Sequence, residues 1–348
     1  METEVIATNN ASLFAAAVAR ASELLRAGQL VALPTETVYG LAANAWNADA
    51  VRRIFEVKGR PSQNPIIVHV ASLELARRCV SDWPPPAAKL AAAFWPGPLT
   101  LILPRSREIS DVVTAGGTTV GVRWPSHPFI QAVIRACGFP LAAPSANRSN
   151  QISPTNAEHV RKDLNGRIPL IVNGGQSQVG IESTVLDLAS SPPRLLRPGM
   201  IDADALLIVI GGGVLQTTAS EWSGGPESLL RSPGLMPKHY SPKARLILLT
   251  WHDEDELGAL VSTYSIKSDK IHVISHSIIP LLQSFGRVSV MPHDAEAYAR
   301  ALYAELHQCD EAGAELIIVE SPPSGEEWRA ITDRLTRAAG GVSKDLSV

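Results

Sequence analysis

The chain has 348 residues, a formal net charge of −3, 45% hydrophobic residues and 19% charged residues. Its length exceeds that of one ordinary domain and favours two, and its hydrophobic fraction excludes a disordered protein. Because the net charge gives no basic signature, contact with nucleic acid or a nucleotide would have to come from a local patch. Cys79, Cys137 and Cys309 fit neither a disulfide framework nor a zinc site built from paired cysteines, so we expect reduced thiols.

The N-terminal segment lacks the charged start, apolar centre and cleavage site of a signal peptide. No uninterrupted apolar run reaches the roughly 18 residues that a membrane-spanning helix needs. We therefore expect a cytoplasmic protein without membrane contact.

The first polar segment of interest follows a short buried strand. Residues 11–26 predict a helix, and residues 28–33 predict the strand. Residues 34–41 then bring two threonines, a glutamate and a tyrosine to the strand end, where α/β proteins bind ligands. A polar turn that caps the next helix explains these residues equally well.

A second segment, residues 58–69, places two cations on a loop that is interrupted by glycine and proline. A predicted helix at 49–57, capped by its first residue, leads into this loop, and a predicted strand at 65–70 ends it. Lys58 and Arg60 could bind an anion there. Alternatively, both cations simply favour the C-terminal end of the preceding helix.

Other polar residues again fall at strand ends. Arg123 follows a turn of small residues, and its planar guanidinium matches a carboxylate or phosphate. Ser145, Asn147 and Ser153 cluster on one connection after a short strand, and residues 152–155 are predicted to cap a helix. Some strands follow each other without a helix, which favours a mixed sheet. We predict further helices at 72–78, 86–94 and 128–137, and further strands at 99–103, 140–143, 168–172, 180–188 and 194–197.

Residues 211–243 are rich in glycine and proline and predict a linker. Its end, residues 232–242, carries aromatic and basic groups that a spacer does not need, so it could fold back as a lid. Beyond it, strands and helices alternate and predict a small doubly wound domain. That domain lacks the G-x-G-x-x-G pattern, so no dinucleotide is assigned. The predicted strands are 245–249, 270–274, 288–291 and 316–319, and the predicted helices are 254–264, 278–285, 295–309 and 327–338.

The usual motifs of P-loop hydrolases, serine hydrolases and zinc enzymes are absent from the sequence. A set of separate motifs in one order instead closely resembles the YrdC family, in its long two-domain form. The similarity covers residues 11–242, whereas the C-terminal domain matches mainly in position, with Asp333 where asparagine is expected and larger residues at 326–328. The motifs are 34–41, Lys58-Gly59-Arg60 with Asn64 and His69, 96–100, 122–125, 144–147, 182–184, 196–199 and 239–242.

The resemblance implies an α/β fold with two domains and a linker. Residues 11–210 would form a YrdC-like catalytic domain with a twisted mixed sheet and surrounding helices. Residues 211–243 would be the Gly/Pro-rich linker and active-site lid, and residues 244–348 a smaller, doubly wound Rossmann-like domain.

The implied activity is ATP-dependent synthesis of L-threonylcarbamoyladenylate from L-threonine, bicarbonate and ATP with release of pyrophosphate, a nucleotidyltransferase reaction. Magnesium would accompany ATP, with no protein residue assigned to a metal. Lys58 and Arg60 would be catalytic. Threonine would be held by Thr37, His69, Arg123, the backbone at Ala143, and Ser183. ATP would be held by Arg60, Asn64, Thr119, Ser145, Asn147, Ser153, Arg197 and Tyr240.

The implied chemistry needs no enzyme nucleophile, because the carbamate of threonine attacks the α-phosphate while pyrophosphate leaves. Catalysis would come from positioning and from cations, with Lys58 as a mobile point charge near the reacting groups. The product would pass to the tRNA threonylcarbamoyl-transfer machinery, with RNA contact as a further expectation.

Two alternatives use the same residues. One is a non-catalytic RNA-binding module, whose phosphate contacts would make binding strongly salt dependent. The density of small hydroxyl and amide groups around a few cations favours a compact ligand instead. The other is a different ATP-dependent adenylylating or carbamoylating enzyme.

Overall fold

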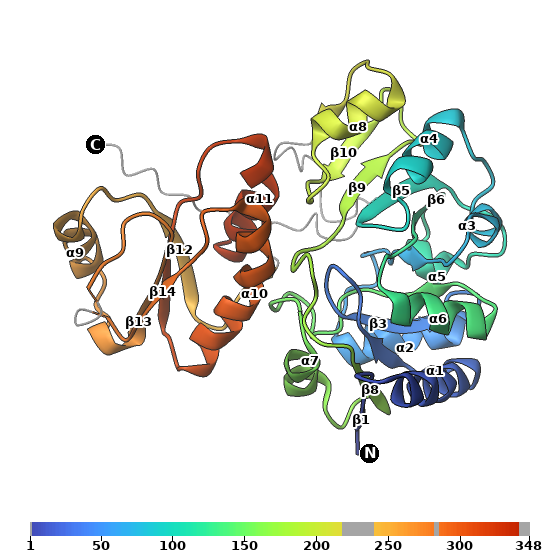
Figure 1. The fold of residues 1–348 in the computed structure, drawn as a ribbon, viewed down its shortest axis with the longest axis horizontal. Helices are drawn as coiled ribbons and strands as arrows, with labels where there is room; N and C mark the ends of the chain where they lie inside the picture. The colour runs from blue at the N-terminus through green and yellow to red at the C-terminus, as the bar shows by residue number, and fades with distance from the viewer. Residues whose placement is uncertain (1, 218–239, 282–284, 341–348) are drawn as a thin grey trace. The chain divides into compact units, whose positions relative to one another are not determined.

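The computed structural model describes residues 2–217, 240–281 and 285–340 (Figure 1). It divides into two compact units, each described below by itself. Unit 1 comprises Met1–Ser149 and Ser153–Leu235, and unit 2 comprises Asn150–Ile152 and Met236–Val348. Of the proposed lid at 232–242, residues 232–239 lie outside the described residues.

Unit 1 is built on one mixed sheet with the strand order β1-β8-β2-β3-β7-β4-β6-β5-β9-β10-β11. The sheet contains both parallel pairs, such as β4 with β6, and antiparallel pairs, such as β4 with β7, which confirms the predicted mixed sheet. Its strands are β1 (Glu4–Ala7), β2 (Val31–Leu33), β3 (Gly40–Asn44), β4 (Val68–His69), β5 (Leu99–Pro104), β6 (Thr119–Arg123), β7 (Leu141–Ala142), β8 (Leu170–Asn173), β9 (Thr184–Asp187), β10 (Arg194–Arg197) and β11 (Gln216–Thr217).

Alternate residues of a strand point to opposite faces of the sheet. Apolar residues lie on both faces here, and helices cover both. In β2, Val31 and Leu33 pack in one core with residues of α1 and α6, while Ala32 packs in another core with residues of α2, α4 and α7. The helices of unit 1 are α1 (Ala11–Arg26), α2 (Ala48–Lys58), α3 (Leu73–Cys79), α4 (Pro85–Phe94), α5 (Asp111–Thr114), α6 (Pro128–Cys137), α7 (Ala157–Leu164) and α8 (Ala203–Ile210).

Several predicted boundaries in unit 1 are wrong, and two of the errors concern helix caps. Asn47, not Asp49, caps α2, because its Oδ1 accepts hydrogen bonds from the amides of Asp49 and Ala50. Asn156, not the segment 152–155, caps α7 through the amide of His159. In both cases the capping asparagine lies directly before the first helical residue, as N-cap geometry requires.

Several predicted strands are shorter than expected, and six strands and α-helices of unit 1 were missed. Ile66 donates its amide to Val113 rather than to a neighbouring strand, so β4 does not span 65–70. Gly180 has a φ of 84°, which an extended strand excludes, so β9 starts only at Thr184. The missed elements are β1, β3, α5, β6, α8 and β11; α8 is apolar from Ala205 to Ile210, and such a run shows no helical periodicity.

Unit 2 is a parallel four-stranded sheet with the order β12-β15-β13-β14, and helices lie on both sides of it (Figure 1). This confirms the small doubly wound domain. Its strands are β12 (Arg245–Leu249), β13 (Ile271–Ser275), β14 (Arg287–Val290) and β15 (Leu316–Glu320), and its α-helices are α9 (Glu254–Ser262), α10 (Ala295–Glu311) and α11 (Arg329–Ala338).

The helix predicted at 278–285 is wrong for its described part. Residues 278–281 form no helix, and the amide of Leu281 donates to the carboxylate of Glu254 instead of to a preceding turn. Residues 282–284 lie outside the described part of the chain.

Within the described ranges, no helix has the length and apolar character needed to cross a bilayer. The cytoplasmic location stays a prediction.

We predict that Gly199→Ala destabilises unit 1. A Cβ at Gly199 would lie 2.3 Å from the amide nitrogen of Thr184, so β9 or its neighbour would have to shift. The expected loss in the free energy of unfolding is about 1–3 kcal/mol, measured by urea denaturation.

Gly258→Ala is the control, because no atom lies within 4 Å of its added Cβ in α9. It should raise the stability of unit 2 by about 0.5–1 kcal/mol. An unchanged midpoint for Gly199→Ala would show that the start of β9 accommodates the added methyl group.

Candidate active site

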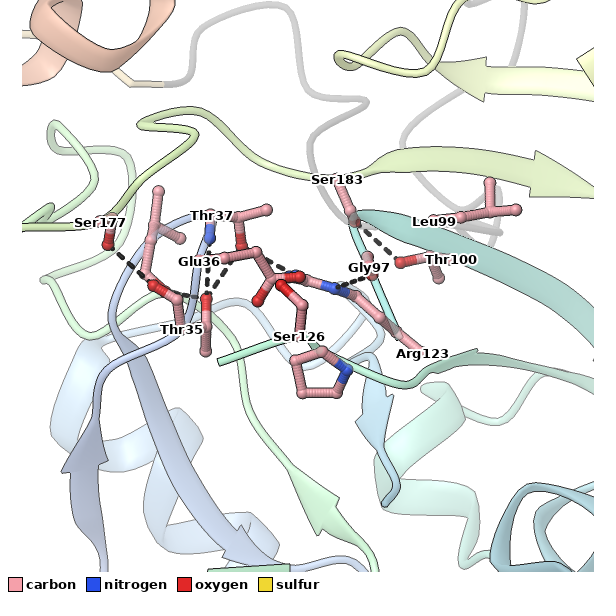
Figure 2. A network of polar contacts seen from close by, with 12 residues as sticks. Thr35, Glu36, Thr37, Gly97, Leu99, Thr100, Arg123, Ser126, Ser177 and Ser183 are labelled. Carbon is pink, nitrogen blue, oxygen red and sulfur yellow. Dashed lines mark hydrogen bonds and ion pairs between the residues drawn. The ribbon is translucent and has the colours of Figure 1, made fainter. Parts of the chain in front are cut away.

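The predicted threonine-binding residues come from elements that are distant in sequence and adjacent in the sheet. β4 pairs with β6 so that His69 lies opposite Arg123, and β4 pairs with β7 so that His69 lies opposite Leu141. The loop after β2 brings Glu36 and Thr37 to the Arg123 side chain (Figure 2). The strand register therefore fixes this half of the site.

Arg123 is held from three directions (Figure 2). Its Nη1 donates to Thr37 Oγ1 at 2.8 Å, its Nε donates to the Gly97 carbonyl at 3.3 Å, and its Nη2 lies 2.6 Å from Glu36 Oε1. The side chains of Arg123 and Glu36 are only 4% and 6% exposed. A guanidinium has five N–H groups, so two remain for a ligand after these contacts. The arrangement suits a carboxylate.

The loop that carries Glu36 and Thr37 is itself fixed by hydrogen bonds. Thr35 Oγ1 donates to the Val38 carbonyl at 2.6 Å, and Ser177 Oγ donates to the Thr35 carbonyl at 3.0 Å. The amide of Val179 donates to the Glu36 carbonyl at 2.7 Å. The alternative in which residues 34–41 only cap a helix is wrong, because β3 follows this loop.

Ser183, a predicted threonine-binding residue, contacts Arg197, a predicted ATP-binding residue. Arg197 donates from Nε to the Ser183 carbonyl at 3.0 Å and from Nη2 to its Oγ at 3.1 Å. Thr100 Oγ1 lies 2.8 Å from the same Oγ (Figure 2). Ser183 and Arg197 are therefore brought together in one buried group.

Lys58 is buried and holds the loop after β7. Its Nζ donates to the carbonyls of Ser145, at 2.5 Å, and Asn147, and to Asn147 Oδ1 at 3.2 Å. Burial, and then the charge of Arg60, hold the pKa of Lys58 well below its usual value. Three acceptors nevertheless match the three N–H groups of an ammonium, and we assign the charged form on this geometry. The expectation of a mobile point charge is wrong for this structure, because these acceptors fix the ammonium.

Arg60 is also buried and shapes its own loop. It donates from Nε to the Asn64 carbonyl at 3.0 Å and from Nη2 to the Pro65 carbonyl at 2.7 Å. Gly59, which ends α2, has a φ of 61°, so the chain turns sharply between the two cations. Both predicted catalytic residues thus have roles in holding loops.

The remaining predicted residues differ in their settings. Ser153 is fully buried and lies 2.6 Å from Glu182 Oε1, to which its hydroxyl donates. The amide of Ala143 donates to the Ile67 carbonyl, so a ligand contact from its backbone would use the carbonyl oxygen. Thr119 begins β6, about 13 Å along the strand from its last residue. Tyr240 belongs to unit 2, where it is buried.

His69 is buried and its Nδ1 has no hydrogen-bond partner among the described residues. Burial, and then the charge of Arg123, lower the pKa of His69 to about 3. At neutral pH the imidazole is therefore uncharged and offers one donor and one acceptor.

Glu36 and Thr100 are among the polar residues at the site that had no predicted role. The sequence showed each within a polar motif. Their importance depends on contacts with Arg123 and Ser183, which lie more than 80 residues further along the chain. Charge pairing across such a separation cannot be read from local sequence.

Comparison with known proteins supports the resemblance. A family model described as Telomere recombination, which covers the Sua5, YciO and YrdC proteins, matches residues 23–199. A second model, described as Threonylcarbamoyl-AMP synthase, C-terminal domain, matches residues 203–340. The chain is therefore a two-domain protein with a YrdC-type first domain.

Similar relatives match this chain over almost their full length. Threonylcarbamoyl-AMP synthase from Bacillus subtilis is 42% identical over 346 residues, which cover 97% of this chain and 96% of the relative. The Pyrococcus abyssi enzyme of the same name is 38% identical over 323 residues, covering 92% and 93%. The crystal structure of P. abyssi Sua5 complexed with L-threonine superposes with a TM-score of 0.88 at 36% identity, covering 97% and 98%. The chain belongs to the threonylcarbamoyl-AMP synthase family.

We predict that His69 makes the stability of unit 1 depend on pH. Its folded pKa of about 3 lies below the value near 6.5 of an unfolded histidine, so the unfolded chain binds more protons between these values. The contribution of His69 therefore falls as pH decreases from about 6.5, by at most about 1.4 kcal/mol per pH unit.

Urea unfolding of the wild type and His69→Gln at pH 7, 6 and 5 measures this effect. The variant should lose less stability on acidification than the wild type. His252→Gln is the control, because this histidine side chain is 83% exposed. The same pH slope in His69→Gln and in the wild type would refute the prediction.

Proposed function

We propose that this chain synthesises L-threonylcarbamoyladenylate from L-threonine, bicarbonate and ATP and releases pyrophosphate, as a nucleotidyltransferase. The observation that carries the proposal is the buried Arg123 fork beside Thr37 and His69, in a chain that matches enzymes of this name over almost its full length. The product would serve the threonylcarbamoyladenosine modification of tRNA through a separate transfer machinery.

The proposed threonine site uses the first group of predicted residues. Arg123 would bind the carboxylate through its two remaining N–H groups. Thr37 and Ser183 offer hydroxyls, neutral His69 offers a ring nitrogen, and Ala143 offers its carbonyl oxygen. Threonine is small, and these partly engaged groups suit a compact ligand rather than an extended RNA backbone.

The proposed ATP site uses the second group, which is rich in cations and amides. Arg60 and Arg197 suit phosphate oxygens. The backbone carbonyls that each of them now contacts fix the guanidinium orientation before the nucleotide binds. The other proposed residues are Asn64, Thr119, Ser145, Asn147, Ser153 and Tyr240.

Magnesium fits this site as an ion carried by the nucleotide. Mg²⁺ binds oxygen ligands and is often held largely through substrate phosphates. The site carboxylates are engaged, since Glu36 pairs with Arg123 and Glu182 accepts from Ser153. Phosphate oxygens would therefore supply most of the ligands that do not come from water. When bound, the ion neutralises charge that develops on the phosphates.

The proposed reaction has two steps. The neutral amine of threonine attacks the carbon of bicarbonate, and loss of water leaves a carbamate. A carbamate oxygen then forms a bond to the α-phosphorus while the bond to pyrophosphate breaks. The enzyme contributes orientation: Arg123 fixes threonine, while Lys58 holds the loop of Ser145 and Asn147 against the nucleotide.

The function is tested by incubating the purified chain with ATP, magnesium and bicarbonate, with and without L-threonine. We expect pyrophosphate and an adenylate with the mass of threonylcarbamoyl-AMP only when threonine is present. Omitting magnesium should strongly reduce both. Pyrophosphate release that does not depend on threonine would exclude the proposed reaction.

Lys58→Ala and Arg60→Ala should each severely reduce threonine-dependent pyrophosphate release, by about tenfold or more. Each change removes charge-assisted hydrogen bonds worth about 1.5–3 kcal/mol and frees a site loop. Arg52→Ala is the control, since its ion pair with Asp49 on α2 is exposed. If both site variants fold and keep near-normal rates, their assignment is wrong.

A further inference from the structure

Glu36 has no part in the mechanism described above, although it lies at the centre of the polar network around Arg123 (Figure 2). Its Oε1 lies 2.6 Å from Arg123 Nη2, and both side chains are more than nine-tenths buried. A buried carboxylate in such a position compensates the charge of its partner and limits the directions in which the guanidinium can point.

We infer that Glu36 is a positioning residue for the amino-acid substrate, which fixes the Arg123 guanidinium so that its remaining N–H groups face the substrate carboxylate. This inference rests on the proposed function. It adds a specificity determinant that acts through Arg123 and does not touch the reacting atoms.

The three contacts of Arg123 differ in kind. Thr37 Oγ1 and the Gly97 carbonyl are neutral acceptors, which orient the guanidinium but do not compensate its positive charge. Within the described residues, Glu36 is the carboxylate that pairs with this guanidinium. Without it, a buried positive charge would lack its partner, and the side chain would turn toward other acceptors or water.

Glu36 is also held firmly enough to act as an anchor. Its carbonyl accepts from the Val179 amide at 2.7 Å, and Ser177 fixes the preceding residue, Thr35. The anchor is therefore tied to the segment between β8 and β9 as well as to its own loop. The orientation of Arg123 therefore depends on the hydrogen bonds that Ser177 and Val179 make to the Glu36 loop.

A role as general base does not fit the surroundings of Glu36. Burial opposes its ionisation, but the adjacent charge of Arg123 favours it, and the pKa of the carboxyl lies below its usual value. A carboxylate stabilised in this way is a poor acceptor for a proton from the threonine ammonium.

The test compares Glu36→Gln, which keeps the shape and removes the charge, with the wild type. We expect at least a tenfold weaker Kd for L-threonine and a Kd for ATP within twofold of the wild type, both measured by calorimetry. Glu305→Gln is the matched control in unit 2, since it breaks the 2.8 Å ion pair with Arg287 by the same substitution. It should leave both Kd values unchanged.

A second variant, Glu36→Asp, distinguishes positioning from bulk stability. It keeps the charge at a shorter reach, so its threonine Kd should fall between those of the wild type and Glu36→Gln, with ATP binding unchanged. A folded Glu36→Gln protein that binds threonine as tightly as the wild type, or more tightly, overturns the inference.

The remaining outcomes are also decisive. If Glu36→Gln does not fold, Glu36→Asp decides: a selective loss of threonine affinity supports positioning, and wild-type affinity overturns it. If the wild type itself does not bind threonine, the proposed function fails and the inference fails with it. A wild type that binds threonine alongside an unaffected variant refutes the role of Glu36 alone.

Discussion

The candidate site depends on one physical constraint, the burial of positive charge. Lys58, Arg60, Arg123 and Arg197 are each more than nine-tenths buried, and each is engaged by oxygen atoms, which for Arg60 come from its own loop and for the others from more distant segments of unit 1. Taking a charge out of water costs several kcal/mol unless acceptors replace the lost hydration. The polar loops at the strand ends supply those acceptors, so the same contacts that permit burial also orient the cations.

The sequence predicted the architecture well where patterns are local. Helix 11–26 and strands 194–197 and 245–249 have the predicted bounds, because capping residues and short apolar runs mark them directly. The helix predicted near 278–285 failed over residues 278–281, because the apolar residues there did not reveal that the amide of Leu281 donates to the distant carboxylate of Glu254. The hydrophobic periodicity of a short segment does not distinguish a helix from an irregular connection.

The sequence motifs suggested residues for the site but could not show how these residues contact one another. The ordered motifs identified Thr37, His69 and Arg123, and the structure places them on adjacent elements. The pairing of Glu36 with Arg123 and the enclosure of Lys58 could not be predicted, because both depend on sheet register. A lysine or arginine side chain on a loop is usually exposed to solvent. Only the tertiary structure shows that Lys58 is buried.

The parallel pairing of β4 with β6 has a consequence for the growing chain. The residues that meet around Arg123 and Ser183 extend from position 36 to position 197, and β6 can join β4 only after the intervening segments have been made. A nascent or truncated polypeptide that ends before β10 would lack Arg197 and therefore the two hydrogen bonds that this side chain makes to Ser183. During translation, the buried polar group around Arg123 and Ser183 can therefore form only after almost the whole first unit has been made.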